Sequence, residues 1–349
     1  MRIVVATAGT PFVRGGAEVL ADELLNALRQ AGHTADLVTI PFNANDPEEI
    51  PDQMLACRLM KLREIHATPV DRLIALKFPA YLIPHPKKVV WLMHQHRAAY
   101  DLWNSPFGGM RNSPRGALVR DIIQRGDQQL GSEAQAIFTI SQNVTRRLRE
   151  FSEIESEPLY HPPAHAAEFF CAETVEDYFF FPSRLSPAKR QELVLEALAL
   201  TQHPVRVKFA GLADSPPYRE RLVKRARELK IEKRVEWLDF VSDVEKRELY
   251  ARALGIVFPP FDEDYGYVTL EGMLAAKAVI TCDDSGGPLE FITPGETGLV
   301  AQPEPASLAA AMDKLWQDRA LAKRCGVEGR RQYERLNLSW SAVVRTLLR

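Results

Sequence analysis

Short apolar segments alternate with amphipathic segments along the whole chain, and this alternation restricts the fold more than any other feature of the sequence. In the first half, the apolar segments are rich in Val and Ile, whereas the segments between them carry apolar residues at helical spacing. Strands that alternate with helices require right-handed crossover connections, so the pattern predicts a parallel sheet flanked by helices. The predicted strands of this half are residues 2–7, 34–40, 71–78, 88–94 and 136–141.

The same alternation starts again after a linker around the adjacent prolines Pro162 and Pro163. The 349 residues suit two domains of about 150 residues each. We therefore predict an α/β protein with two doubly wound parallel-sheet domains, residues 1–165 and 166–332, that face a cleft. The last segment is predicted to be a long helix, residues 333–349, that returns to the first domain. The predicted strands of the second half are residues 177–184, 205–211, 234–239, 254–260, 277–282 and 297–302.

Composition narrows the class of protein. Hydrophobic residues make up 46% of the chain and charged residues 26%, as is typical of soluble globular proteins. The formal net charge is −2 and no block carries a strong surplus of one sign, which argues against nucleic acid as the main partner. No apolar run is long enough to span a membrane, and the N-terminal segment is typical of a strand rather than a signal peptide.

The spacing of the four cysteines fits no zinc site, so we expect free thiols that are buried or half-buried, and no bound metal. Reduced thiols favour a cytoplasmic location. The cysteines are Cys57, Cys171, Cys282 and Cys325.

Two loops that follow predicted strands of the first domain carry candidate ligand contacts. Gly15 and Gly16 precede a helix, where glycine lets the backbone approach a ligand and the first N–H groups favour an anion. These glycines match no dinucleotide fingerprint, so a flexible loop is an equal alternative. His94 and His96 follow another strand, and the strand-end position favours His94 as a hydrogen-bonding or acid–base group over a structural histidine.

The stretch "FFFPSRLSPAKR" places two cations, Arg184 and Lys189, between a predicted strand and a helix from about residue 187 to 200. Ser186 is a candidate N-cap and Pro187 suits the first helical turn. Two cations beside a helix N-terminus form a pocket for a diphosphate. The alternative is a pair of solvated surface charges.

The stretch "FDEDYGYVTLEGM" places two carboxylates, Glu263 and Glu271, after another predicted strand, with a helix that begins near Gly266. A helical carboxylate can accept two hydrogen bonds from the vicinal hydroxyls of a ribose, and a second carboxylate can hold sugar hydroxyls. The alternative is a solvated acidic loop and an ordinary helical glutamate. Gly286 and Gly287 repeat the pattern of strand, glycine turn and helix, and could line the same pocket.

Together, the stretches "GGAE", "SRLSPAKR", "EDYGYVTLEGM" and "SGGPLEFITPGETGLV" resemble the signature of glycosyltransferase family 4. The resemblance implies the GT-B fold of two Rossmann-like domains and sugar transfer from a nucleotide donor with retention of anomeric configuration. It is strongest from about Phe179 to Pro303. Two positions depart from the family pattern, because Arg190 stands where glycine is common and "AAKAVI" replaces A-x-G-x-P-V-I.

The resemblance implies a role for each matching residue. Arg184 and Lys189 would stabilise the departing diphosphate in place of a metal ion, and Glu271 would bind the ribose. The implied catalytic residues are His94, Arg184, Lys189 and Glu263. The implied donor-binding residues are Gly15, Gly16, Arg184, Lys189, Glu263, Gly266, Tyr267, Val268 and Glu271.

Three other classes of protein fit parts of the pattern. The run from Asp262 to Asp264 reads D-x-D, the manganese motif of metal-dependent transferases with another fold, although here it lies deep in a second α/β unit. An epimerase or phosphorylase could share the two-domain scaffold, but we find no separate acid–base pattern for an epimerase. A non-catalytic nucleotide-sugar-binding protein would not need groups that stabilise a leaving group.

The partners implied by the resemblance are a nucleotide-sugar donor, such as a UDP- or GDP-sugar, and a saccharide or lipid-linked acceptor. Bacterial surface-polysaccharide synthesis is a setting implied in the same way. Residues 52–66 carry apolar side chains at helical spacing with Arg58, Lys61 and Arg63 nearby. This segment could lie on an anionic membrane, and a core-packed helix with a solvated basic edge is an equal alternative.

Overall fold

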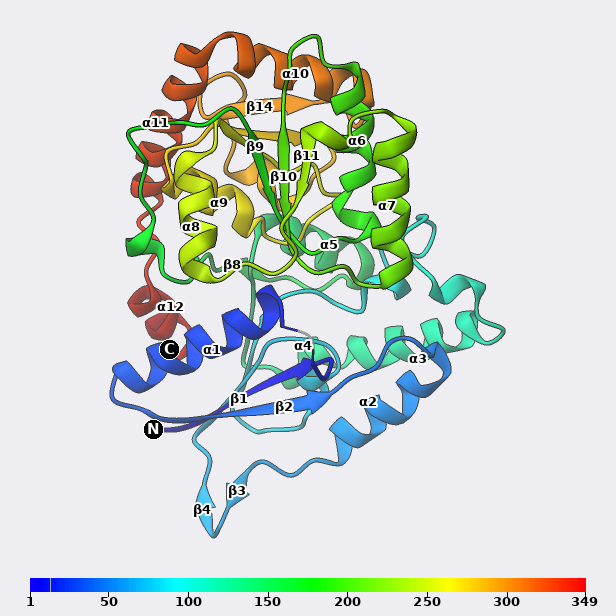
Figure 1. The fold of residues 1–349 in the computed structure, drawn as a ribbon. Helices are drawn as coiled ribbons and strands as arrows, with labels where there is room; N and C mark the ends of the chain where they lie inside the picture. Colours follow the sequence, from blue (N-terminus) through cyan, green and yellow to red (C-terminus); the bar gives the residue numbers. More distant parts are fainter. Residues whose placement is uncertain (13) are drawn as a thin grey trace. The chain divides into compact units, whose positions relative to one another are not determined.

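The computed structural model describes residues 1–12 and 14–349 and divides the chain into two compact units (Figure 1). The N-terminal unit comprises Met1–Ala164 together with Ser339–Arg349, and the C-terminal unit comprises His165–Leu338. Each unit is built on one six-stranded sheet in which every neighbouring pair of strands is parallel.

The sheet of the N-terminal unit has the strand order β2-β1-β5-β6-β7-β8. Its strands are β1 (Arg2–Gly9), β2 (Thr34–Pro41), β5 (Arg72–Ala75), β6 (Lys88–Leu92), β7 (Ala136–Thr139) and β8 (Glu157–Pro158). Its α-helices are α1 (Gly16–Gln30), α2 (Ile50–Leu59), α3 (Gly116–Gln128), α4 (Leu130–Glu133), α5 (Gln142–Ser152) and α12 (Trp340–Leu347). Strands β1, β5 and β6 are buried along nearly their whole length, because neighbouring elements cover both faces of a parallel sheet.

The sheet of the C-terminal unit has the strand order β11-β10-β9-β12-β13-β14. Its strands are β9 (Phe179–Pro182), β10 (Val207–Ala210), β11 (Val235–Trp237), β12 (Gly255–Val257), β13 (Val279–Cys282) and β14 (Gly298–Ala301). Its α-helices are α6 (Gln191–Leu200), α7 (Pro216–Glu228), α8 (Asp243–Arg252), α9 (Tyr267–Leu274), α10 (Pro305–Gln317) and α11 (Arg319–Leu336). Helices α6 and α7 lie on one side of the strands, and α8 and α9 lie on the other (Figure 1).

This strand order reverses direction between β9 and β12, because the chain first adds β10 and β11 on one side of β9 and then returns to add β12 on the other. Ligands of open α/β sheets bind outside the carboxyl ends of the strands at such a switch point. The loops that follow β9 and β12 are therefore the positions where this unit is expected to hold a ligand.

Short 3-10 helices lie in the connections of both units. Those of the N-terminal unit are η1 (Pro47–Glu49), η2 (Ala80–Leu82), η3 (Arg97–Ala99) and η4 (Met110–Asn112). Those of the C-terminal unit are η5 (Ala166–Glu168), η6 (Pro187–Lys189), η7 (Glu232–Arg234) and η8 (Gly287–Glu290).

The prediction of one long C-terminal helix is wrong. Helix α11 ends at Leu336 because Asn337 adopts a left-handed conformation with φ of 47°. A new helix, α12, then starts after Ser339, whose side chain accepts a hydrogen bond from the backbone of Ala342. The guanidinium of Arg72 in β5 donates to the carbonyl oxygen of Leu347 at 3.0 Å and so fixes α12 within the N-terminal unit.

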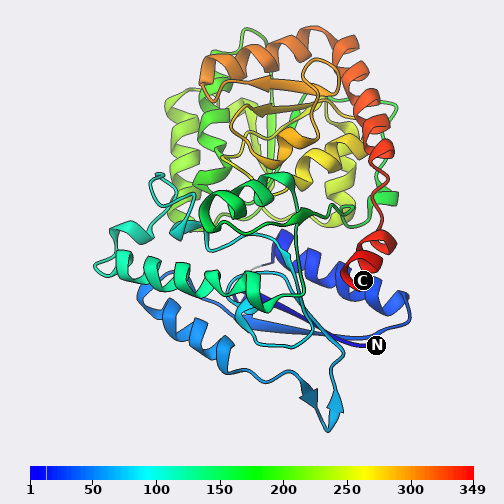
Figure 2. The same ribbon diagram turned by 180° about the vertical axis from the view of Figure 1, so that it is seen from behind.

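The predicted amphipathic segment 52–66 is also shorter than expected. Helix α2 ends at Leu59, and the chain then forms a small hairpin of β3 (Glu64–Ile65) and β4 (Thr68–Pro69) that extends away from the sheet in both views (Figure 1 and Figure 2). Arg58 does not belong to a solvated basic edge, because its guanidinium pairs with Glu133 at 2.7 Å. Within the described residues, no helix has both the length and the apolar character required to cross a membrane.

The expectation for the cysteines is correct for three of the four positions. Cys57, Cys282 and Cys325 are buried free thiols, whereas Cys171 is free but exposed. Cys171 lies in the connection before β9, where the surrounding residues are largely solvated. Burial was expected because free cysteine is commonly a small core residue.

One departure from the family pattern lies in the turn between α9 and β13. Ala276 has a φ of 53°, a left-handed conformation that glycine adopts without steric cost, and the pattern A-x-G-x-P-V-I places glycine there. We expect Ala276→Gly to raise the free energy of unfolding by about 1 kcal/mol, measured by urea denaturation. The same change at Ala275, whose φ is −82°, should lower it. A lower stability for Ala276→Gly would contradict the argument.

Candidate active site

Lys189 and Glu263 meet at the switch point of the C-terminal sheet. Lys189 ends η6, just after β9, and Glu263 lies in the loop after β12. The ammonium group of Lys189 donates a hydrogen bond to Oε2 of Glu263, and both side chains are about four-fifths buried, with 19% and 24% exposed. The Lys189 Nζ also lies 5.5 Å from the centroid of the Phe258 ring. A cation and a carboxylate are thus held together where a ligand is expected.

The backbone before Lys189 differs from the predicted helix. Residues from Pro187 form only the 3-10 turn η6, and Arg190 adopts a left-handed conformation before α6 begins at Gln191. Ser186 occupies the predicted N-cap position with Pro187 in the first turn, but its side chain makes no capping hydrogen bond. The short turn places Lys189 at the end of a tight loop rather than on the side of a helix.

Backbone hydrogen bonds fix the loop that carries Glu263. The amide of Glu263 donates to the carbonyl oxygen of Ser285 at 2.9 Å, and the amide of Gly287 donates to the carbonyl oxygen of Glu263 at 2.8 Å. On the other side, the amide of Phe261 donates to the carbonyl oxygen of Ala188 at 2.8 Å. Gly287 permits this packing, since a Cβ there would lie 2.6 Å from the carbonyl oxygen of Tyr265.

Helix α9 begins beside this loop. Its N-cap is Gly266, whose φ of 95° favours glycine, and a Cβ at this position would also approach Pro288 to 3.0 Å. Tyr267 and Val268 follow as the first helical residues. The N–H groups of a first helical turn have no intrahelical acceptors and attract anions. The predicted helix start near Gly266 is therefore correct.

Glu271 lies within α9 and is only 8% exposed. Its Oε2 accepts a hydrogen bond from the hydroxyl of Tyr250 at 2.8 Å, and its Oε1 accepts one from the ammonium of Lys246 at 2.9 Å. Burial and the neighbouring carboxylate raise the pKa of Tyr250 well above its usual value, so the phenol stays protonated and donates. Burial lowers the pKa of Lys246, but Glu271 outweighs burial and the net shift is upward. The two donors therefore fix the orientation of the Glu271 carboxylate.

Arg184 points to a different partner. Its guanidinium forms an ion pair with Asp214 at 2.8 Å, and half of the side chain is exposed. The structure therefore joins Lys189 to Glu263 directly, but gives Arg184 and Glu271 separate partners. Since surface ion pairs contribute about 0–1 kcal/mol, a ligand anion could draw Arg184 away from Asp214 at little cost.

The remaining predicted residues belong to the N-terminal unit. Gly15 is the N-cap of α1 and its amide donates to the carboxylate of Glu18 at 2.8 Å, while Gly16 is the first helical residue. His94 follows β6, and its Nδ1 lies 2.6 Å from the carbonyl oxygen of Gln95, which requires the hydrogen on Nδ1. The donor contacts of Gly15, Gly16 and His94 stay predictions.

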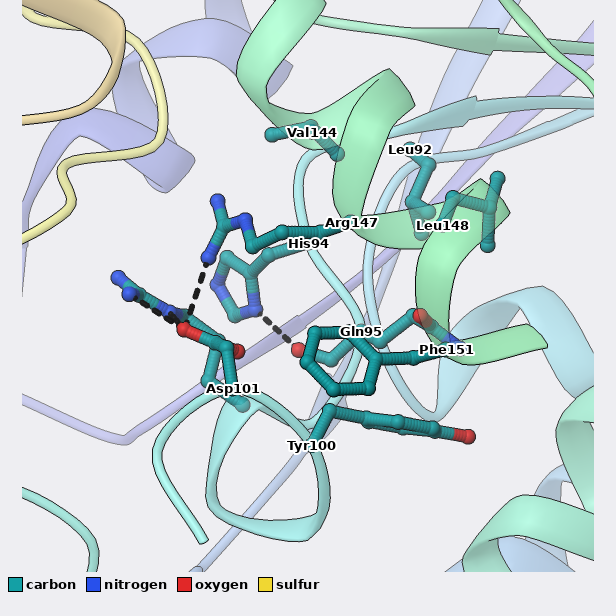
Figure 3. Close-up of a pocket in the computed structure, with 10 residues that line it drawn as sticks. Leu92, His94, Gln95, Tyr100, Asp101, Val144, Arg147, Leu148 and Phe151 are labelled. Atoms are coloured by element: carbon teal, nitrogen blue, oxygen red, sulfur yellow. Dashed lines mark hydrogen bonds and ion pairs between the residues drawn. The ribbon is translucent and has the colours of Figure 1, made fainter. Parts of the chain in front are cut away.

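His94 lines a small pocket of the N-terminal unit (Figure 3). Beside it, Asp101 accepts hydrogen bonds from Arg97 at 2.6 Å and Arg147 at 3.2 Å. Burial lowers the pKa of the adjacent His96 to about 4, so this partly buried imidazole is neutral at pH 7. The residues around the pocket are Leu92, His94, Gln95, Arg97, Tyr100, Asp101, Val144, Arg147, Leu148 and Phe151.

A buried carboxylate supports this pocket through hydrogen bonds to two of the residues that line it. Asp127 accepts hydrogen bonds from the hydroxyls of Tyr81 at 2.8 Å and Tyr100 at 2.7 Å, and from the side-chain amide of Gln95 at 3.0 Å. Burial raises the pKa of Asp127 to about 6, although the three donors oppose the shift. The network orients Gln95, whose carbonyl oxygen holds His94.

Several of these residues could not be identified from the sequence. Lys246 and Tyr250 are four residues apart and so share one face of α8, which was the available signal for a joint role. Their contact with Glu271 depends on how α8 packs beside α9. Asp127 carried no signal, because it is one of two acidic residues in an amphipathic helix and nothing distinguishes it from Asp121.

Comparison with solved structures identifies the fold class as that of GT-B glycosyltransferases. The chain is similar to sucrose-phosphate synthase (tll1590) from Thermosynechococcus elongatus, with a TM-score of 0.80, 17% identity and coverage of 99% of this chain and 97% of that one. It is also similar to WaaG, a glycosyltransferase involved in lipopolysaccharide biosynthesis, with a TM-score of 0.74, 17% identity and 98% coverage of both chains. The predicted fold class is confirmed.

Residues 172–332 match the model of the family described as Glycosyl transferases group 1. The chain is 31% identical over 122 residues to the alpha-1,3/1,6-mannosyltransferase ALG2 of Dictyostelium discoideum, which is 35% of this chain and 29% of the relative. It is 30% identical over 162 residues to the D-rhamnosyltransferase WbpZ of Pseudomonas aeruginosa, 46% of this chain and 41% of the relative. These matches span less than half the length of either relative.

Proposed function

We propose that this protein is a glycosyltransferase that moves a sugar from a nucleotide-diphosphate sugar to a saccharide or lipid-linked acceptor, with retention of anomeric configuration. The observation that carries the proposal is the contact of Lys189 with Glu263 at the carboxyl ends of β9 and β12. Lys189 provides a cation for the leaving diphosphate, and Glu263 provides a carboxylate for the sugar.

The chemistry assigns a part to each charge. Breaking the bond between sugar and phosphate places negative charge on the diphosphate and positive character on the sugar ring. The ammonium of Lys189 and the first turn of α9 after Gly266 stabilise the first charge. The carboxylate of Glu263 stabilises the positive character on the sugar ring. When the donor binds, this carboxylate gives up part of its contact with Lys189 and contacts the sugar instead. Arg184 turns from Asp214 to the diphosphate.

Glu271 holds the nucleoside. Tyr250 and Lys246 each donate one hydrogen bond to its carboxylate. A carboxylate has about four acceptor positions, so it can still accept two hydrogen bonds from the vicinal hydroxyls of a ribose. The neighbours fix the carboxylate before the ligand arrives, which reduces the entropy lost on binding. The deduced donor is therefore a ribonucleoside diphosphate sugar.

The names of the relatives support the reaction and suggest acceptors. One further relative is the O-antigen chain mannosyltransferase C of Escherichia coli, and a structurally similar protein, HepE of Anabaena, was solved with UDP and glucose. We therefore propose a UDP- or GDP-sugar as the donor and a growing saccharide as the acceptor. Lys189 and Arg184 take the part that a divalent cation plays in other sugar transferases, so we expect activity in the presence of a chelator.

A nucleoside diphosphate is expected to raise the melting temperature of the protein, because it binds only the folded state. At about 100 times its dissociation constant the ligand adds roughly 2.7 kcal/mol of stability. The measurement is a thermal-shift screen with UDP, GDP, ADP and CDP and the corresponding sugars, followed by product analysis with and without EDTA. Binding without turnover would favour the non-catalytic sensor, and no shift with any nucleotide would contradict the proposal.

A further inference from the structure

Arg190 combines an unfavourable backbone conformation with an extensive set of side-chain contacts. It has φ of 60° and ψ of 40° between η6 and α6, a left-handed conformation that carries a steric cost for any residue with a Cβ. The family pattern that the sequence resembles commonly has glycine at this position. A strained backbone conformation persists only where other contacts of the residue offset its cost.

The side chain of Arg190 makes that contact with Asp284. Its two terminal nitrogens donate to the two carboxylate oxygens of Asp284 at 2.7 and 2.6 Å, which is the bidentate geometry of a strong ion pair. The guanidinium also lies 5.1 Å from the centroid of the Phe261 ring. Only 15% of the Arg190 side chain is exposed, so water screens the pair weakly.

The ion pair of Arg190 with Asp284 joins the turn after β9 to the loop after β13, and both segments form hydrogen bonds with the loop that carries Glu263. Arg190 follows Lys189 directly, and Asp284 precedes Ser285, which accepts the amide hydrogen of Glu263. The carbonyl oxygen of Asp284 also accepts the amide hydrogen of Asp262 at 2.9 Å. The ion pair between Arg190 and Asp284 therefore links the turn that carries Lys189 to the loop that holds the backbone of Glu263. The hydrogen bond between Lys189 and Glu263 joins the same two segments directly.

We propose that Arg190 is a positioning residue, which through Asp284 sets the separation and orientation of Lys189 and Glu263. This inference rests on the proposed function. It assigns Arg190 no contact with substrate, and its effect therefore falls on the step in which the diphosphate leaves. Because loss of geometry slows chemistry more than binding, we expect kcat to change more than KM.

The ion pair of Arg190 with Asp284 is called the clamp below. Arg190→Gly removes the clamp and relieves the backbone strain, whereas Asp284→Asn removes the clamp alone. We expect both variants to lower kcat roughly 10- to 100-fold with KM for the donor changed less than about 3-fold. The double variant should be no slower than the slower single variant, because both remove one interaction. Arg190→Gly should melt at a higher temperature than Asp284→Asn, because glycine relieves the strain.

A charge exchange provides the rescue test. Arg190→Asp and Asp284→Arg each place like charges together, and the two changes combined should recover kcat to within about 10-fold of the native value, since Asp tolerates the left-handed conformation. The matched control is Asp239→Asn, which breaks the bidentate pair with Arg219 at 2.8 and 3.0 Å elsewhere in the same unit and should leave kcat unchanged.

Amide hydrogen exchange tests the clamp without any substrate, so failure of the proposed function leaves this measurement intact. In Arg190→Gly and Asp284→Asn, the amides of Asp262 and Glu263 should exchange at least about 10-fold faster than in the native protein, while Asp239→Asn leaves them unchanged. Native exchange rates in both clamp variants would overturn the inference. Multiplicative losses of kcat in the double variant would also overturn it, because they would show two independent effects.

Discussion

Lys189→Ala is expected to lower kcat for sugar transfer about 100- to 1000-fold, which is the usual cost of removing one group that stabilises a charged leaving group or oxyanion. The ammonium of Lys189 is mostly buried and held against Glu263, so it is already oriented when a donor binds. Preorganised charge in a water-poor site contributes more than the same charge in solvent. Steady-state kinetics with the donor identified by the thermal screen provide the measurement.

The matched control for this substitution is Lys224→Ala, which removes an exposed lysine of α7 with 79% of its side chain accessible. It should leave kcat unchanged. A Lys189→Ala enzyme with a native kcat would remove the leaving-group role from Lys189. A loss confined to KM would assign Lys189 to ground-state binding of the donor instead.

Glu271→Ala is expected to weaken nucleoside diphosphate binding about 100-fold, since it removes two hydrogen bonds from the ribose to an ionised acceptor. The same change leaves the hydroxyl of Tyr250 and the ammonium of Lys246 without their carboxylate, so the free energy of unfolding should fall by about 3 kcal/mol. Calorimetric titration of the folded variant measures the first effect, and urea denaturation measures the second.

Tyr250→Phe separates the two effects. It removes one hydrogen bond to Glu271 from the protein side, and its partner carboxylate keeps Lys246. We expect a loss of about 1 kcal/mol of stability and only a few-fold weaker binding. Equal loss of binding in Tyr250→Phe and Glu271→Ala would contradict a direct contact between Glu271 and the ribose.

Most of the fold could be predicted because buried parallel strands read as continuous apolar runs. The segment around Phe180 and the segment around Ile256 became β9 and β12, at the centre of the C-terminal sheet. Lys189 and Glu263 were predicted to follow these strands, and the structure places both in the loops at the carboxyl ends of β9 and β12. Helix boundaries were harder, because Asn337 ends α11 by a backbone conformation that many sequences could adopt.

The partners of the site residues could not be predicted, because they depend on packing between distant segments. Glu271 bonds to side chains 21 and 25 residues earlier, and Arg184 pairs with Asp214, 30 residues later. Hydrophobic periodicity reports which face of an element is buried and contains no information about such polar pairs. The 3-10 turn at Lys189 was also missed, because the left-handed conformation of Arg190 interrupts a segment whose sequence pattern is helical.

The central claim is that the ammonium of Lys189 and the carboxylates of Glu263 and Glu271 form one donor site in the C-terminal unit. A crystal structure with the nucleoside diphosphate that most raises the melting temperature tests it most directly. The account predicts a diphosphate oxygen within hydrogen-bonding distance of Lys189 Nζ and ribose hydroxyls on the carboxylate of Glu271. A nucleotide bound elsewhere, with Lys189 and Glu271 untouched, would contradict it.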